Sequence, residues 1–162
     1  MIKFGKIRHG AKIPSYATSG SGWADIYACF DEYEMVIPPH ECKLIPTGLC
    51  SEFPKGYRLG LYERGSNSKS NMQIMCGKID SDYRQEIFVA VYNANNVPME
   101  ITKGVDSVEK TADFVRVPYS KAICQVAIEI VPDVEIVEGN VEEMINRDSE
   151  RKGAEALGST GR

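Results

Sequence analysis

The chain has 162 residues and a formal net charge of −4, with 19 basic and 23 acidic side chains. This length fits one domain with a single core, and the acidic balance argues against sequence-independent nucleic-acid binding, which needs a basic face. The five cysteines show no metal-binding spacing, and no apolar stretch reaches the roughly 18 residues of a membrane span. We therefore expect one soluble, cytoplasmic domain over residues 1–162, with reduced thiols and no nucleic-acid or membrane partner.

Short apolar runs rich in Val, Ile, Tyr and Phe recur along the chain, separated by turn residues such as those at 38–39 and 46–48. This pattern predicts an all-β fold, a sandwich or barrel of short strands. Residues 1–8 can pair as an edge strand. Helical periodicity is confined to three brief segments, residues 67–72, 105–111 and 141–147.

Residues 63–69 follow a predicted strand over residues 57–62 and suit the binding of phosphate. The fork of Arg64 matches two phosphate oxygens, and the Ser66 hydroxyl with the N–H of Gly65 can hold a bridging oxygen. The plain alternative is that Glu63 and Arg64 form a solvated surface pair.

Residues 77–84 lie between two apolar runs and combine a carboxylate with an aromatic ring. Residues 81–82 are turn formers, so Asp80 and Tyr83 should flank a tight connection and point into one cavity. From these residues alone, the simpler interpretation is an ordinary β-hairpin in which Asp80 accepts bonds from backbone N–H groups.

The second half of the chain carries three further signals. Residues 96–117 mix charges without periodicity, which predicts a solvated surface excursion. Gln125 lies in an apolar strand and needs partners for its amide. The tail, residues 149–162, has the small and polar composition of a frayed end. Its glycine N–H groups and the hydroxyls of Ser159 and Thr160 could equally wrap a phosphate.

Five segments, in chain order, resemble the five signature motifs of the trimeric dUTP diphosphatase (dUTPase) family, bacterial or phage type: 22–28, 63–69, 77–84, 119–128 and 149–161. The resemblance implies a distorted jelly-roll β-barrel with few short helices. It implies a homotrimer with shared active sites, in which the C-terminal lid, residues 149–162, is exchanged between chains. The implied reaction is Mg²⁺-dependent hydrolysis of dUTP to dUMP and pyrophosphate, by attack of water on the α-phosphorus.

The resemblance also implies a role for each site residue. Asp80 is the catalytic residue, which orients or deprotonates the attacking water, and Tyr83 lies against the deoxyribose and excludes a 2′-hydroxyl. Backbone groups of residues 76–79 read uracil, and Asp25 holds Mg²⁺ through water; on sequence alone Asp25 is equally a strand cap. The remaining substrate-binding residues are Arg64, Gly65, Ser66, Gly77, Lys78, Ile79, Gln125, Arg151, Leu157, Gly158, Ser159 and Thr160.

Departures from the family pattern and two alternative functions accompany the resemblance. Gln85 stands where the family usually has glycine, and Leu157 where it more often has a stacking aromatic residue. A dCTP deaminase of the same fold and a phage nucleotide-sensing regulatory protein are the alternative functions. For the second, the insert at residues 96–117 is the predicted contact of a repressor-type protein partner.

Overall fold

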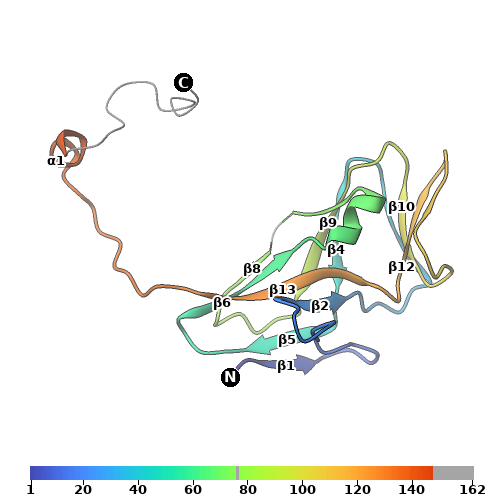
Figure 1. Cartoon of the computed structure of the whole chain (residues 1–162), viewed down its shortest axis with the longest axis horizontal. Helices are drawn as coiled ribbons and strands as arrows, with labels where there is room; N and C mark the ends of the chain where they lie inside the picture. Colours follow the sequence, from blue (N-terminus) through green and yellow to red (C-terminus); the bar gives the residue numbers. More distant parts are fainter. Residues whose placement is uncertain (76, 148–162) are drawn as a thin grey trace. The chain divides into compact units, whose positions relative to one another are not determined.

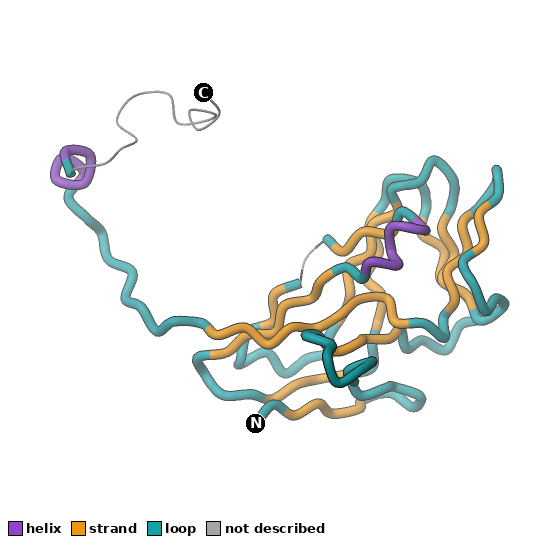
Figure 2. The backbone as a smooth tube through the Cα atoms, viewed as in Figure 1, coloured by secondary structure: helices purple, strands orange, loops and turns teal. Residues whose placement is uncertain are grey.

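The computed structural model describes residues 1–75 and 77–147, which are mainly strand and loop (Figure 2). Contacts divide the chain into two compact units, residues 1–132 and 133–162. The described part of the second unit holds one α-helix, α1 (Val141–Asn146), whose N-cap residue Asn140 accepts a hydrogen bond from Glu143 N. The all-β prediction is confirmed for the first unit, whose described elements are all strands apart from one 3-10 helix.

One sheet of the first unit carries most of the predicted site. Its strand order is β2 (Ala24–Tyr27), β13 (Ala122–Ile130), β6 (Tyr57–Tyr62) and β8 (Lys78–Ile79), all antiparallel. In Figure 1 the long strand β13 crosses the unit beside β2 and β6. The sheet therefore brings together segments that lie about 100 positions apart in the chain, as the facing pair Gln125 and Asp25 shows.

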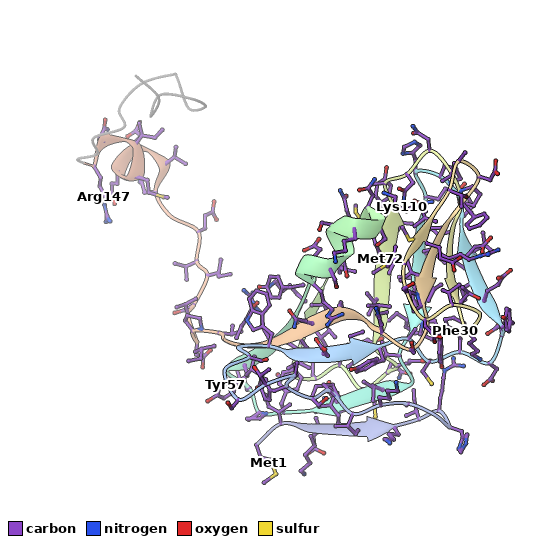
Figure 3. The ribbon with its side chains drawn as sticks, turned by 45° about the vertical axis from the view of Figure 1, so that its right-hand side comes forward. Met1, Phe30, Tyr57, Met72, Lys110 and Arg147 are labelled. Atoms are coloured by element: carbon purple, nitrogen blue, oxygen red, sulfur yellow. The ribbon has the colours of Figure 1, made fainter. Side chains whose placement is uncertain are left out.

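Three further sheets complete the unit. The first runs β4 (Cys42–Pro46), β9 (Phe88–Asn93), β7 (Met72–Ile74), and the second pairs β1 (Lys3–Lys6) with β5 (Leu49–Glu52). The third runs β11 (Glu109–Lys110), β12 (Val115–Pro118), β10 (Met99–Thr102), β3 (Glu34–Ile37). Strand β1 confirms the edge strand predicted over residues 1–8. Figure 3 labels Tyr57, at the start of β6, and Phe30, after β2, at opposite ends of this unit.

A single apolar core lies between these sheets, because alternate residues of each strand point to one face. The largest fully buried side chains are Ile26, Ile37, Ile45, Leu49, Leu59, Ile87, Val89, Val91, Met99, Ile101, Val115 and Ile123. The turn between β4 and β5 is fixed by Gly48, which has φ +67° and no room for a Cβ against Ala11 and Arg8. The buried hydroxyl of Thr47 donates to Ile87 O at 2.6 Å and ties this turn to β9.

Two of the three predicted helices form, and one prediction is wrong. Residues 65–70 make a 3-10 helix, η1 (Gly65–Ser70), and α1 matches the last predicted segment. Residues 105–111 instead contain strand β11, because the Thr111 hydroxyl accepts from Asp113 N and Phe114 N in a turn that pairs β11 with β12. Within residues 1–75 and 77–147, no helix is long and apolar enough to cross a membrane.

The prediction that residues 96–117 form a solvated excursion is wrong for both ends of that segment. Strand β10 pairs with β3 and runs parallel to β12, and Met99, Ile101 and Val115 are buried in the core. Apolar alternation in these short strands outweighs the mixed charge around them. Only the connection between them, residues 103–114, remains largely at the surface.

A buried asparagine network joins the end of η1 to the turn after β9. Asn93 is fully buried and its Nδ2 donates to the carbonyls of Ile37, Pro38 and Val97 at 2.9 to 3.1 Å. Its Oδ1 accepts from the N and Nδ2 of Asn95, whose Nδ2 also donates to Ser70 O at 2.8 Å. The network therefore fixes the C-terminal end of η1 against the turn after β9.

We expect Asn93→Ala to lower the free energy of unfolding by about 2 to 3 kcal/mol, because several buried backbone carbonyls lose their donor at once. The measurement is urea unfolding followed by circular dichroism. Asn96→Ala is the matched control: this exposed residue accepts one bond from His40 Nε2 at 2.9 Å, and its loss should cost less than about 0.5 kcal/mol. Equal effects of the two variants would contradict the network's role.

Candidate functional site

A cavity of about 470 Å³ lies between β8 and the strands β4, β6 and β9. Its lining includes Gly77, Lys78 and Ile79 from β8 and its lead-in, and Asp80 and Tyr83 from the turn that follows. Leu44, Leu61, Asp82, Ile87 and Phe88 complete it. The structure therefore brings Asp80 and Tyr83 into one cavity, as the turn predicted, beside an apolar wall.

The connection at residues 80–87 is not the hairpin that the sequence suggested. Strand β8 pairs with β6, whereas β9 pairs with β4 and β7, so the turn passes between two sheets. Tyr83 N donates to Asp80 O at 3.2 Å, and the Tyr83 hydroxyl donates to Glu86 O at 2.8 Å. These bonds fix the turn and the Tyr83 ring, and both Asp80 and Tyr83 line the cavity.

Gly77 allows β8 to approach β6 more closely than another residue would. Leu61 N donates to Gly77 O at 2.6 Å, and a Cβ at position 77 would lie 2.5 Å from Leu61 O. Because that contact is with backbone, a rotamer change cannot relieve it. Strand β8 is the edge strand of its sheet, so one side of its backbone pairs with β6 and the other side has no neighbouring strand in that sheet, while its residues line the cavity.

Glu86 anchors the far end of the same turn. Its carboxylate accepts two bonds from the Arg8 guanidinium, at 2.8 and 2.9 Å, and one from Gly48 N at 2.9 Å. Hydrogen bonding to Arg8 lowers the pKa of Glu86 below its usual value and outweighs the opposing effect of burial. Glu86 thus fixes the carbonyl to which Tyr83 is bonded.

A lowered pKa in the folded state means that Glu86 stabilises the fold above its unfolded pKa of 4.5, and that this contribution is lost as the pH falls through the folded pKa. We expect Glu86→Gln to unfold more easily at neutral pH, by about 1 to 2 kcal/mol, and to lose less stability on acidification than the parent chain. Urea unfolding at about pH 7 and about pH 3.5 measures both. Parallel pH profiles for the two chains would show that Glu86 does not contribute.

A second cluster forms where β2, β6 and β13 meet. Asp25 on β2 is 6% exposed, and Gln125 Nε2 on β13 donates to its Oδ1 at 3.0 Å. Arg64 follows β6: its Nη2 donates to Asp25 Oδ2 at 3.3 Å, and its Nε lies 3.2 Å from Asp25 Oδ1. Nη1 also donates to Ala122 O at 3.1 Å and to the Ser66 hydroxyl at 3.4 Å. The amide of Gln125 thus has the partner that its strand position requires.

Arg64 is paired with Asp25 but stays partly accessible. Its Nε is buried beside Asp25 Oδ1, and the side chain as a whole is 25% exposed. Arg64 is the N-cap of η1, with Gly65 and Ser66 in the first turn, and a cavity of about 260 Å³ is lined by Arg64, Ser66, Asn67, Lys69 and Lys121 among others. Three basic side chains and no acidic one line this cavity among the described residues. The site suits an anion.

The sequence analysis missed Lys69 and Lys121 as site candidates. Both lie beside motif residues, Lys69 within 63–69 and Lys121 within 119–128, but only the pairing of η1 with the start of β13 brings them to one cavity. The bond from Asn67 Nδ2 to Ile123 O at 2.9 Å makes that connection. The sequence did contain a signal for them, because each of these two motifs, both assigned to phosphate binding, includes a lysine.

The predicted site residues therefore fall into two groups in one chain. The residues of the first cavity, with Asp80 and Tyr83, and those of the second, with Arg64 and Ser66, have no lining residue in common. Cys76 and the predicted tail residues Arg151, Leu157, Gly158, Ser159 and Thr160 lie outside the described residues.

Magnesium fits this arrangement as an ion held through water and phosphate oxygens, and not by protein side chains alone. The described ranges contain no group of three His, Cys, Asp or Glu side chains that could hold a metal directly. Magnesium usually keeps several waters and binds through one or two carboxylates and the phosphates of a substrate. Asp25 offers one carboxylate with lone pairs left after its bonds to Gln125 and Arg64, which suits contact through a metal-bound water.

Comparisons with known proteins identify the family of this chain. The dUTPase family model matches residues 9–161. A deoxyuridine 5'-triphosphate nucleotidohydrolase of Wolbachia pipientis is 32% identical and covers 99% of this chain and 95% of its own. One of Nitrosospira multiformis is 36% identical and covers 93% and 89%.

Solved structures of phage dUTPases share the fold. A variant dUTPase of Staphylococcus bacteriophage 80alpha with dUpNHpp has a TM-score of 0.72 and 21% identity, and covers 100% of this chain and 99% of its own. A variant from phage phi11 of S. aureus, which coordinates a structural Mg(II) ion, has a TM-score of 0.64 and 18% identity, with coverage of 86% and 97%. The family model and the relatives from Wolbachia pipientis and Nitrosospira multiformis establish that the chain belongs to the dUTPase family.

Proposed function

We propose that this chain hydrolyses dUTP to dUMP and pyrophosphate. The observation that carries the proposal is the placement of Asp80 and Tyr83 together in a cavity that residues of the edge strand β8 also line. Membership of the dUTPase family supports it. The reaction would limit uracil incorporation into DNA and supply dUMP, and we place it in the cytoplasm, where the free thiols of Cys29, Cys42, Cys50 and Cys124 stay reduced.

In this proposal the first cavity holds the nucleoside. Backbone N–H and C=O groups of residues 77–79 pair with the edge of uracil, and a buried polar site of this kind rejects a base that leaves its groups unpaired. The Tyr83 ring packs on the deoxyribose, so that a 2′-hydroxyl would collide with it. Asp80 orients the attacking water and accepts its proton as the new oxygen–phosphorus bond forms and the bond from the α-phosphorus to the bridging oxygen breaks, which releases pyrophosphate.

The second cluster holds the phosphates. The Arg64 fork, the Ser66 hydroxyl and the Gly65 N–H at the start of η1 meet phosphate oxygens, and Gln125 bonds a phosphate oxygen or a metal-bound water. Magnesium, when bound, neutralises charge that develops on the phosphates. The lid proposed for residues 149–162 would add Arg151, Leu157, Gly158, Ser159 and Thr160 to a bound nucleotide.

The test is a product assay. The chain is incubated with magnesium and dUTP, dCTP, dTTP or UTP, and pyrophosphate and ammonia are measured. Pyrophosphate from dUTP alone is the expected result. Ammonia from dCTP would identify the deaminase alternative, and nucleotide binding without any product would identify the nucleotide-sensing alternative.

We further propose that the active site is shared between chains of a homotrimer. The separation of the Asp80 cavity from the Arg64 cluster supports this, because a single dUTP must reach both groups. A mixing experiment tests it: Asp80→Asn and Arg64→Lys chains, each impaired alone, are co-expressed. If the two groups come from different chains, about a quarter of the sites regain both wild-type residues. No recovery in the mixed assembly would place each site within one chain.

A protein regulator is a second proposal, supported by the position of residues 103–114. Ser107 and Val108 line the same cavity as Arg64, so a partner bound there would lie next to the phosphate cluster. Excision of residues 102–115 would remove the buried side chains of Thr102 and Val115, so the better variant replaces residues 105–112 with a short Gly/Ser linker. A pull-down that captures the same partner with both chains would contradict the proposal.

A further inference from the structure

A cluster of ionic and aromatic side chains lies across three strands next to the proposed nucleoside cavity. The Glu129 carboxylate on β13 accepts from Arg58 Nε at 2.6 Å, from Lys78 Nζ at 2.7 Å and from the Tyr62 hydroxyl. Lys78 Nζ also donates to Tyr62 Oη at 2.7 Å and lies 4.6 Å from the centre of its ring. The bond from Lys78 makes the largest contribution to lowering the pKa of Glu129 to about 2, so the carboxylate is ionised at neutral pH.

Gly60 makes room for this cluster. It faces Lys78 in the β6–β8 register, and a Cβ there would collide with Glu129 Oε1 and lie 2.7 Å from the Tyr62 ring. Because Gly60 has no side chain, the side chain of Lys78 can pass over β6 at this position and reach Glu129 on β13. Lys78 and Ile79 point to opposite faces of β8, with Ile79 buried in the core and Lys78 in the cluster.

Strand β8 has few other attachments. It is two residues long, occupies the edge of its sheet and is in register with β6 at only two positions. Gly77, Lys78 and Ile79 nevertheless line the cavity with the backbone groups proposed to read the base. A small displacement of this strand would misalign those groups, and recognition by fixed polar groups tolerates little displacement.

We infer that Lys78 is a positioning residue, whose ammonium, held by Glu129 and Tyr62, fixes β8 against β6 and β13 and so sets the geometry of base recognition. This inference rests on the proposed function. An ordinary surface ion pair contributes little to stability. The Glu129 cluster differs from such a pair because the Glu129 side chain is only 19% exposed and its carboxylate binds donors from two further strands.

The experiment measures Lys78→Met, Lys78→Arg and Glu129→Gln in the full chain. Deoxyuridine and pyrophosphate are titrated separately, because the first probes the nucleoside cavity alone and the second the phosphate cluster alone. We expect Lys78→Met and Glu129→Gln to weaken deoxyuridine binding and raise KM for dUTP about five- to tenfold, with kcat within about twofold and pyrophosphate binding unchanged. Lys78→Arg should restore most of the loss, since a cation again reaches Glu129.

Trp23 supplies a readout that does not depend on turnover. It is the chain's single tryptophan and stacks on Tyr62 with ring centroids 4.7 Å apart, so its fluorescence should change in Lys78→Met and recover in Lys78→Arg. Lys3→Met is the matched control, because it removes another cross-strand pair, Lys3 with Glu52 at 3.3 Å, without touching β8. It should leave KM and fluorescence unchanged.

The outcomes separate the inference from the proposed function. If the parent chain hydrolyses dUTP but Lys78→Met keeps its KM, or changes only its thermal midpoint, the inference is overturned and the function stands. If equal losses occur in deoxyuridine and pyrophosphate binding, the effect is general and the inference is again overturned. A parent chain that releases no pyrophosphate from dUTP overturns the proposed function, while the deoxyuridine titration still tests the role of Lys78.

Discussion

Asp80→Asn is expected to lower kcat for dUTP by about 10²- to 10⁴-fold and to leave nucleotide binding nearly unchanged. The amide keeps the shape of the side chain and its place in the cavity, so the nucleoside contacts of Tyr83 and β8 remain. It cannot accept a proton from the attacking water. Pyrophosphate release at saturating dUTP measures turnover, and titration with a non-hydrolysable dUTP analogue measures binding.

Asp82 provides the contrast, because it is a carboxylate two positions away that lines the same cavity. Asp82→Asn removes the same charge from the cavity, yet it should lower kcat by no more than about threefold if position rather than charge matters. Similar losses in the two variants would mean that the negative potential of the cavity, and not a water held by Asp80, drives the reaction. Near-normal turnover in Asp80→Asn would remove Asp80 from its proposed role.

Substitution of Arg64 is expected to have the second-largest effect, and two variants separate its two roles. Arg64→Ala leaves the buried Asp25 carboxylate with Gln125 as its remaining side-chain donor among the described residues. We expect a loss of about 3 kcal/mol in the free energy of unfolding, together with loss of dUTP hydrolysis. Urea unfolding and pyrophosphate release measure the two effects.

Arg64→Lys keeps the charge but loses the planar fork that spans both Asp25 oxygens and reaches Ala122 O. The chain should therefore lose no more than about 1 kcal/mol of stability, while kcat/KM for dUTP falls by about 10²-fold because a point charge cannot hold two phosphate oxygens at once.

Gln125→Glu is a useful companion to the Arg64 variants, since it puts a second carboxylate next to Asp25 and should weaken pyrophosphate binding. Full activity in Arg64→Lys would mean that Arg64 serves Asp25 alone.

Local features of the chain predicted what depends on local physics. Alternating apolar residues and turn formers gave the strands and the all-β class, and residues 80–83 gave a turn with its carboxylate and ring on one cavity. Resemblance of short segments to the family motifs then predicted roles for Arg64 and Gln125, and the structure shows that both contact Asp25.

Pairing between distant strands could not be predicted in this way. Nothing near β8 in the chain indicates that it pairs with β6 rather than β9, and the parallel pairing of β10 with β12 made core strands of a segment that reads as a charged loop. The Glu129 cluster likewise depends on residues 51 and 71 positions away from that carboxylate. Such contacts follow from burial of the whole core, which no short segment specifies.

The close approach of Gly77 to the Leu61 carbonyl has a bearing on how this family member could evolve. If the base is recognised by main-chain atoms of β8, no single side chain encodes the preference for uracil, and the contact at position 77 forbids even one added carbon. A change of specificity to another pyrimidine would then require a different backbone conformation of β8, which a single substitution would not provide. Selectivity for uracil would thus be conserved together with the main-chain conformation of β8, and single substitutions would not erode it gradually.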